Sequence, residues 1–436
     1  MCFAGIVQTF QPMLAIFSLK KTPIMLISFT PINVQVLRLL HTPVVSPSSS
    51  TGETPIAPVT SGFEAVLKRL MALTSNVQAL LKTIGCMAIT GLCVSMPLHA
   101  QTVTSTFPVG NDPQFVAFNP VGSQAYVVNY NNGGDGSVSV INTASNTPTG
   151  TTIPVGNSPV HVAFSPDGTR AYVVNKGFFD KSVSVIDTAS NTVITTITTG
   201  IGVLPNAVAV SPDGTKAYVA SQNGNNVSVI DTASNTVTGA AIPVGTGPQH
   251  VAVSPDGSKA YVANANSDSV SVIDTANNTV TTISVGDLPY HVAFSPDGSK
   301  AYVANFGSNT ISVIDTASGT VTNTISVGTG PLGVSFSPDG SKAYVVNAGS
   351  GTVSLIDTAS GTVIRTIPVG IAPTSVAFSP DGSKAYVTNL GNDNVSVISF
   401  APPISEASPI PTLAEWAMIL MASLMGLLAF VRMRRQ

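Results

Sequence analysis

The sequence predicts an all-β protein, a seven-bladed β-propeller of four-stranded blades that its own N-terminal strand closes. An A-Y-V step recurs seven times between residues 101 and 400, and its tyrosines are spaced by 46, 46, 43, 41, 42 and 42 residues. Short runs rich in Val, Ile and Thr surround each step, and these residues favour strands. A repeat of this length built from short strands is typical of one propeller blade. The seven tyrosines are Tyr126, Tyr172, Tyr218, Tyr261, Tyr302, Tyr344 and Tyr386.

Each part of one repeat, residues 242–282, has a physical reason to form a strand or a turn. HVAVS suits a buried innermost strand, KAYVAN and SVSVIDT suit the middle strands, and the Thr-rich run that follows suits an outer edge. S-P-D-G predicts a tight hairpin between the first two strands, because Pro fixes φ and Gly accepts positive φ. We expect its Asp to pair with the base three residues later, as a feature of the hairpin rather than of a ligand site.

The turn between the third and fourth strands has one position that holds only Asn or Gly. These two residues most readily accept a left-handed backbone, so we interpret the restriction as a turn constraint. The preceding aspartate in blades 2 to 6 is expected to cap the same turn. The restricted residues are Asn146, Asn191, Asn235, Asn278, Gly319 and Gly361.

The number of strands predicts how the ring closes. The seventh repeat ends after its third strand, at residues 395–398. A strand-like run at residues 102–107 precedes the first repeat. We expect this run to supply the missing fourth strand of the last blade, because doing so removes an open sheet edge.

Charge and cysteine content exclude some function classes for the repeat region. Residues 101–409 contain nine Lys and Arg against eighteen Asp and Glu. Such an acidic body argues against nucleic acid as a partner, since phosphate binding needs Lys and Arg. The three cysteines, Cys2, Cys86 and Cys93, all precede residue 100, so the repeats have neither a disulfide nor a thiolate metal ligand.

Both ends of the chain carry features of export. Residues 71–100 combine Lys82, an apolar run and a small residue before Gln101, which predicts a signal peptide, although a buried helix is the alternative. Residues 1–70 show no clear period, and we expect them to be a non-native or disordered upstream extension. Residues 401–409 are a linker.

The last 27 residues combine a motif, an apolar helix and terminal arginines. The motif consists of Ile410, Pro411, Thr412, Leu413, Glu415 and Trp416, and the arginines are Arg432, Arg434 and Arg435. This segment resembles the IPTL-CTERM bacterial sorting signal, with Ala417 where that signal usually has Gly. The resemblance implies an exosortase-type envelope protease as a partner and anchoring of the helix in the inner membrane before processing. The arginines favour a cytoplasmic C-terminus. A permanent tail anchor is the alternative.

The repeat itself, with its AYV[VAT]N core and SPDG turn, resembles the YVTN family of β-propeller repeats over about 300 residues. That family resembles lactonase-like, quinoprotein-like and haem-d1-binding propellers and occurs in microbial surface proteins. The resemblance implies the fold, but it does not imply one activity, since propellers host unrelated functions.

Candidate site residues lie where the blades differ, on the face that carries the starts of the inner strands. His161, His250 and His291 occupy one equivalent position in blades 2, 4 and 5. They are candidates for a metal or haem site, and polar rim residues are the simpler interpretation. Two of the three are not neighbours in the ring, and no carboxylate or cysteine recurs beside them, which argues against a metal or haem site. Aromatic residues of the same face are candidates for partner binding: Tyr130, Phe178, Phe179, Tyr290 and Phe306.

No catalytic constellation is visible between residues 101 and 400, which contain no Glu, Cys, Met or Trp and only two Arg. The sequence therefore predicts a non-enzymatic interaction or matrix protein without a cofactor, exported to the cell surface, the outer envelope or the medium. Its ligand would be a protein or a glycan. The alternative is a lactonase-like, quinoprotein-like or haem- or metal-binding enzyme of the periplasm or the surface.

Overall fold

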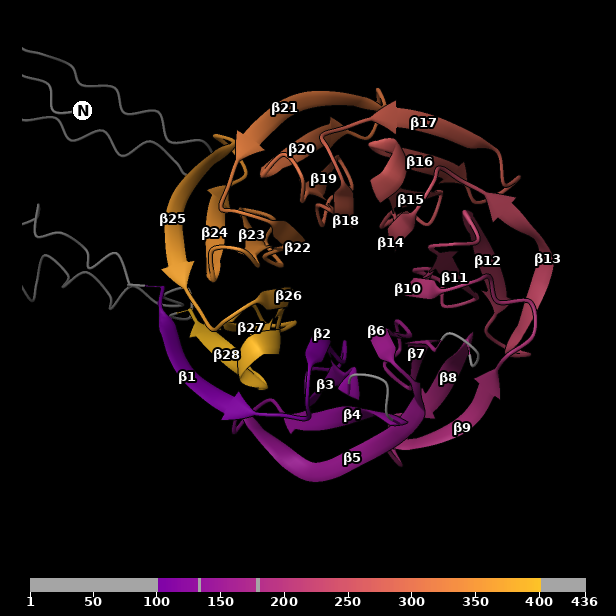
Figure 1. Ribbon diagram of the computed structural model, residues 1–436, viewed down its shortest axis with the longest axis horizontal. Coiled ribbons are helices and arrows are strands. Elements are labelled where there is room, and N and C mark those ends of the chain that lie inside the picture. Colours follow the sequence, from indigo (N-terminus) through magenta and orange to yellow (C-terminus); the bar gives the residue numbers. More distant parts are fainter. Residues whose placement is uncertain (1–100, 132–134, 178–180, 401–436) are drawn as a thin grey trace, which may run out of the picture. The chain divides into compact units, whose positions relative to one another are not determined.

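A computed structural model of the chain describes residues 101–131, 135–177 and 181–400. In these residues seven antiparallel four-stranded sheets surround a central channel as the blades of a propeller (Figure 1). This confirms the predicted fold class and the number of blades. The predicted segments 1–70, 71–100, 401–409 and 410–436 lie outside the described residues.

We number the blades 1 to 7 along the chain and give their strands from the channel outward. Blade 1 contains β2 (Pro113–Phe118), β3 (Gln124–Asn129), β4 (Asp135–Asn142) and β5 (Thr147–Asn157), and blade 2 contains β6 (Pro159–Phe164), β7 (Arg170–Lys176), β8 (Lys181–Asp187) and β9 (Thr192–Ile197). Blade 3 contains β10 (Pro205–Val210), β11 (Lys216–Ser221), β12 (Asn226–Asp231) and β13 (Thr236–Pro243), and blade 4 contains β14 (Pro248–Val253), β15 (Lys259–Asn264), β16 (Ser269–Asp274) and β17 (Val280–Ser284). Blade 5 contains β18 (Pro289–Phe294), β19 (Lys300–Asn305), β20 (Thr310–Asp315) and β21 (Thr320–Ser326), and blade 6 contains β22 (Pro331–Phe336), β23 (Lys342–Asn347), β24 (Thr352–Asp357) and β25 (Thr362–Pro368). Blade 7 contains β26 (Pro373–Phe378), β27 (Lys384–Asn389), β28 (Asn394–Ser399) and β1 (Val103–Pro108), and the 3-10 turns η3 (Ala265–Ser267) and η4 (Leu390–Asn392) lie in blades 4 and 7.

The ring closes as the sequence predicts. Strand β1 runs antiparallel to β28, with Phe107 opposite Val395, and completes the sheet in the order β1-β28-β27-β26. In Figure 1 the two ends of the propeller meet in this blade, at the outer edge of the ring. The Phe107 ring packs edge-on against Tyr386 at 5.4 Å, so the closing strand also contributes to the core.

Tyrosine side chains fill the space between neighbouring blades. All seven are at most 1% exposed. In five blades the ring contacts a phenylalanine of the next blade at a centroid distance of 4.6–4.8 Å, as between Tyr302 and Phe336. In the other two the partner is a valine. The tyrosine thus recurs because each blade needs one large side chain to pack against its neighbour.

A buried asparagine explains the end of the AYVxN step. In blade 4 the Nδ2 of Asn264 donates to the hydroxyls of Ser269 and Ser271, at 3.3 and 3.0 Å. The preceding P-V-G glycine lies against it, and a Cβ added to Gly245 would be 2.6 Å from that Nδ2. The glycine is required here by close approach rather than by its backbone angle.

Both predictions for the turn between the third and fourth strands are confirmed, the left-handed backbone and the capping aspartate. The Asn-or-Gly position has φ between 53° and 68° in all six blades. Aspartates cap the same turn, since the backbone N–H of Ser190 donates to Asp187 Oδ1 at 2.8 Å. In blade 1 Asn142 does the same for Ala144, at 3.0 Å, which is why that blade tolerates the loss of the acid.

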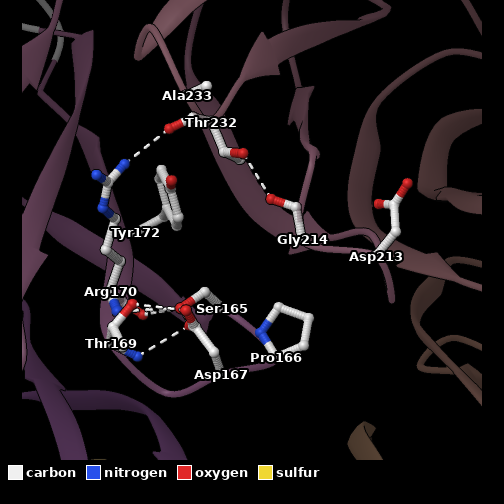
Figure 2. Close-up of a pocket in the computed structure, with 10 residues that line it drawn as sticks. All are labelled: Ser165, Pro166, Asp167, Thr169, Arg170, Tyr172, Asp213, Gly214, Thr232 and Ala233. Carbon is white, nitrogen blue, oxygen red and sulfur yellow. Dashed lines mark hydrogen bonds between the residues drawn. The ribbon is translucent and has the colours of Figure 1, made fainter.

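The expected pairing of the S-P-D-G aspartate with the following base was wrong. Asp167 instead accepts hydrogen bonds from the Ser165 hydroxyl at 2.5 Å and from the Thr169 backbone N–H at 3.0 Å. Arg170 reaches the next blade and donates to the backbone carbonyl of Thr232 at 2.8 Å (Figure 2). The carboxylate is satisfied within its own turn, so the base is free to connect blades.

This link between blades recurs around the ring. Lys259, Lys300 and Lys384 donate to the carbonyls of Thr316, Thr358 and Thr143, each in the following blade. The equivalent position of blade 7 is Phe400, whose backbone N–H donates to the Ser383 carbonyl as that of Thr358 does to Ser341. Lys342 of blade 6 does not form the link to it; its Nζ donates to Asp357 of its own blade at 2.8 Å, the one ion pair among the described residues.

Candidate functional site

The channel is lined by two levels of side chains from the seven innermost strands. The level nearer the S-P-D-G turns consists of small residues: Ala117, Ala163, Ala209, Ala252, Ala293, Ser335 and Ala377. The level nearer the opposite face is the position singled out in the sequence: Phe115, His161, Ala207, His250, His291, Gly333 and Ser375. The channel is therefore wide and apolar below this second level and narrow at it.

Four rings of the second level meet at the channel axis. Phe115 and His161 have ring centroids 3.8 Å apart, and His250 stacks on His291 at 3.7 Å. His161 Nε2 lies 3.2 Å from His250 Nε2. Inner strands of non-adjacent blades converge on so narrow a channel that the side chains of His161 and His250 touch across it. His161 and His250 are each only 7% exposed, so they close the channel rather than stand on its rim.

Burial keeps the histidines neutral. It lowers the pKa of His161 to about 3, helped by the charge of nearby His291, and lowers the pKa of His291 to about 3. Burial, with the other two imidazoles, also holds the pKa of His250 well below its ordinary value. The Val208 N–H faces His161 Nδ1 at 3.5 Å, which assigns the proton to Nε2 of His161 and makes His250 Nε2 the acceptor.

Above these rings lies a pocket of about 380 Å³, which we call the mouth pocket. Phe115, His161, His250 and His291 form its floor. Tyr130, Lys176 and Leu390 contribute from the loops and ends of the second strands. The remaining wall comes from one position in every blade, directly before the floor position: Gln114, Val160, Asn206, Gln249, Tyr290, Leu332 and Thr374.

A polar chain crosses one side of the mouth pocket. Lys176 Nζ donates to Asn206 Oδ1 at 2.7 Å. Asn206 Nδ2 donates in turn to the carbonyl of Gln249 at 2.7 Å and to its side-chain oxygen at 3.1 Å. Partial burial lowers the pKa of Lys176 from its ordinary value of 10.5. None of the described residues that line the pocket is acidic.

The aromatic candidates divide into three groups. Tyr130 and Tyr290 line the mouth pocket. Phe306 lies beside Tyr290, with ring centroids 5.9 Å apart, and each of the two is 39% exposed. Phe178 and Phe179 lie outside the described residues. The structure thus brings three of the five predicted residues to one face.

Metal ligation is not supported by the geometry of the described residues. Among them no group of three or more His, Cys, Asp or Glu side chains converges so as to hold a metal ion. The stacked arrangement of His250 on His291 presents ring faces rather than nitrogen lone pairs to one another.

Residues 101–131, 135–177 and 181–400 contain no helix long and apolar enough to span a membrane.

Sequence reasoning missed Asn206, Gln249 and Gln114 and did not assign Lys176 a role. The signal was present one residue before the histidine position, where the seven blades carry six different residue types. Three of the seven residues at this position are amides: Gln114, Asn206 and Gln249. Comparing every position of the repeat for variation, rather than one, would have found them.

Comparison with known proteins agrees with this architecture. The family described as "Lactonase, 7-bladed beta-propeller" matches residues 142–282 and 230–366, and the IPTL-CTERM motif matches residues 408–435. Many solved structures share the fold, among them a chain of hydrazine synthase from Kuenenia stuttgartiensis, with 26% identity and a TM-score of 0.60 over 70% of this chain and 99% of that one. No curated protein matches.

The C-terminal match confirms the predicted sorting signal, which indicates export to the cell surface and processing by machinery of the exosortase type. The resemblance to YVTN repeats stays a prediction. The two propeller matches together span residues 142–366, just over half of the sequence. The chain therefore belongs to the lactonase-type family of seven-bladed β-propellers and carries a C-terminal IPTL-CTERM motif.

Proposed function

We propose that this chain is an exported, non-enzymatic binding protein that holds a protein or glycan partner at the mouth pocket. The observation that carries the proposal is the composition of that pocket. Its described lining combines aromatic rings, side-chain amides and one lysine, on a floor of neutral rings. Such a surface offers apolar faces and hydrogen bonds without an acidic group to act on a substrate.

The scaffold supports the same function. Backbone ladders in seven sheets, tyrosines between blades and the lysine links fix the positions of the pocket residues. A pre-formed pocket loses little conformational entropy on binding, which favours affinity. Tyr290 and Phe306 extend the apolar surface beyond the pocket, where a larger partner would make contact.

The sorting signal supports a location outside the cell. We propose that its helix anchors the chain in the inner membrane before processing, with Arg432, Arg434 and Arg435 on the cytoplasmic side. Processing would then release the propeller to the surface or the medium. The signal peptide at residues 71–100 belongs to the same proposal.

The test is binding of the full chain, purified from its native host, to arrays of glycans and to the host's own surface material. Replacing Tyr290 and Phe306 by alanine should weaken binding at least tenfold, because both aromatic contacts are lost. Ile364→Ala is the matched control, since Ile364 is also exposed and apolar but lies on the outer strand β25. Equal binding by the double variant and the wild type would refute a role for this face.

An enzymatic function is the second candidate, and family membership is the observation that favours it. The solved neighbour is itself an enzyme by its title. The measurement that decides is hydrolysis of a panel of lactones by the purified chain, together with its visible absorption spectrum. The enzymatic function would be favoured over the binding function by either of two results. One is lactone hydrolysis that His250→Ala or Lys176→Met abolishes, and the other is a chromophore bound to the purified chain.

A further inference from the structure

The positive charge at the mouth pocket has no acidic partner among the described residues that line it. Lys176 ends β7, and its ammonium group carries three N–H donors. One of them is used on Asn206 Oδ1, at 2.7 Å. Asn206 is itself held by Gln249, so the ammonium is tied in place, and the described residues leave two of its donors for a ligand.

This charge contrasts with the rest of the propeller. Residues 101–400 contain seventeen Asp against nine Lys and Arg. Four of the bases that begin the second strands are occupied in links between blades, as Arg170 is with Thr232. Lys176 instead faces a concave site whose floor consists of neutral rings. A partly buried cation in a water-poor pocket attracts an anion more strongly than an exposed one does.

The kind of cation restricts which anions suit the pocket. A single ammonium group presents one positive charge and lacks the planar fork with which arginine binds phosphate at two oxygens. It suits a ligand with one negative charge, such as a carboxylate. The pocket volume of about 380 Å³ admits a small ligand or the end of a longer one.

The other residues that line the pocket indicate which kind of molecule bears the carboxylate. Gln114 and Gln249 offer amide groups that both donate and accept hydrogen bonds, as neighbouring hydroxyls require. Tyr130 and Tyr290 supply rings whose faces pack against C–H groups. Hydroxyls on the edge of a ring and C–H groups on its face are the chemistry of a saccharide.

We propose that the mouth pocket binds an acidic sugar, a uronate at the end of a glycan or a free sugar acid, with its carboxylate on Lys176. The inference rests on the proposed function, whose partner it narrows to one chemical class. Asn206 positions the ammonium group, and the amides and tyrosines contact the sugar ring.

The experiment compares glucuronate and galacturonate with glucose and galactose, titrated against the full chain by calorimetry and ligand-observed NMR. The wild type should bind a uronate at least tenfold more tightly than its neutral sugar, with an affinity that falls as salt rises. Lys176→Met should remove this preference, so that the affinity for the uronate falls to that for the neutral sugar. Lys176→Gln, which keeps a donor toward Asn206, should do the same and shows that lost charge rather than misfolding is responsible.

Lys216→Met is the matched control, because Lys216 is an exposed lysine at the start of β11, beside an S-P-D-G turn. It changes the net charge equally and should leave the preference for uronates intact. Equal affinity for uronates and neutral sugars would overturn the inference while leaving a binding site at the mouth. Tighter binding of glucose 6-phosphate than of glucuronate would overturn the carboxylate assignment. Absence of any saccharide or surface binding by the wild type would refute the proposed function. Loss of all binding when Tyr290 and Phe306 are replaced would support it.

Discussion

Imidazole rings of three blades occupy the channel axis of this propeller. Their neutrality follows from burial, because a charged imidazole would lose its hydration with no carboxylate on the described pocket lining to compensate. Stacking of His250 on His291, and the single bond between His161 and His250, are what the neutral forms can offer one another. The floor therefore stays neutral in the folded protein at pH values where a free histidine gains a proton, and the stability of the fold decreases there.

Acidification from pH 7 to pH 5 should destabilise the propeller. The unfolded chain gains protons on these histidines below about pH 6.5, whereas the folded pKa of His161 and of His291 is about 3. Stability is therefore complete above pH 6.5 and falls as the pH drops through the window between 6.5 and 3. At pH 5 the loss is about 2 kcal/mol for each histidine that stays neutral. Urea unfolding at several pH values measures it.

His291→Phe separates this effect from other titrations. The variant keeps a flat ring against His250 and removes one titrating group, so its loss between pH 7 and pH 5 should be smaller by about 2 kcal/mol. Hairpin carboxylates do not interfere, since hydrogen bonds from Ser254 and Ser258 lower the pKa of Asp256 to about 2. An unchanged pH dependence in the variant would mean that the slope has another source.

Links between blades act at the scale of strands and turns. At the junction of blades 7 and 1, Asn146 Oδ1 accepts hydrogen bonds from Tyr386 at 2.6 Å and from Lys384 at 3.1 Å. Asn146→Gly keeps the positive φ and removes both bonds, which should lower the free energy of unfolding by about 1–3 kcal/mol. Asn278→Gly is the natural control, because Asn278 has the same backbone conformation and its side chain makes no such bond with the described residues. The control should change stability by only a few tenths of a kcal/mol; equal losses in the two variants would show that the bonds contribute nothing.

Close packing of the P-V-G glycine on the buried asparagine gives a second prediction for the blade. Gly245→Ala places a Cβ 2.6 Å from Asn264 Nδ2 and should cost about 1–3 kcal/mol through overpacking. Asn264→Ala alone should cost a similar amount, because its two bonds to serine hydroxyls are lost. In the double variant the overpacking disappears, so the two losses should not add. Additive losses in chemical unfolding would contradict a direct contact.

The sequence was informative where a feature is repeated or local. The A-Y-V step located every blade, and the Asn-or-Gly position identified a left-handed turn, because both follow from chain-local chemistry. Contacts between side chains of non-adjacent blades could not be predicted from the sequence. Nothing in the spacing of His161 and His250 says that their imidazoles meet, since that depends on the width of the channel. The aspartate and lysine of the hairpin looked like partners because only their sequence separation was visible.

Closure of the ring is a property of the whole molecule. Removing residues 101–108 deletes β1, leaves β28 with an unpaired edge and exposes the core beneath Phe107. We expect the truncated chain to lose its sharp thermal transition and to aggregate, because unpaired edges recruit other chains. Light scattering and calorimetric melting measure both effects. Fusing the same strand after residue 400 should restore the fold; failure of that permuted chain to recover would mean that the N-terminal position, not the strand, is required.

The pairing of β1 with β28 joins residues 293 positions apart, as between Thr104 and Val397. The seventh sheet therefore cannot form until both ends of the repeat region are available. Loop-closure entropy opposes contacts of such separation until most of the chain is in place. We expect this sheet to be the last to gain protection from a protease, because its outer strand and its three inner strands come from opposite ends of the propeller.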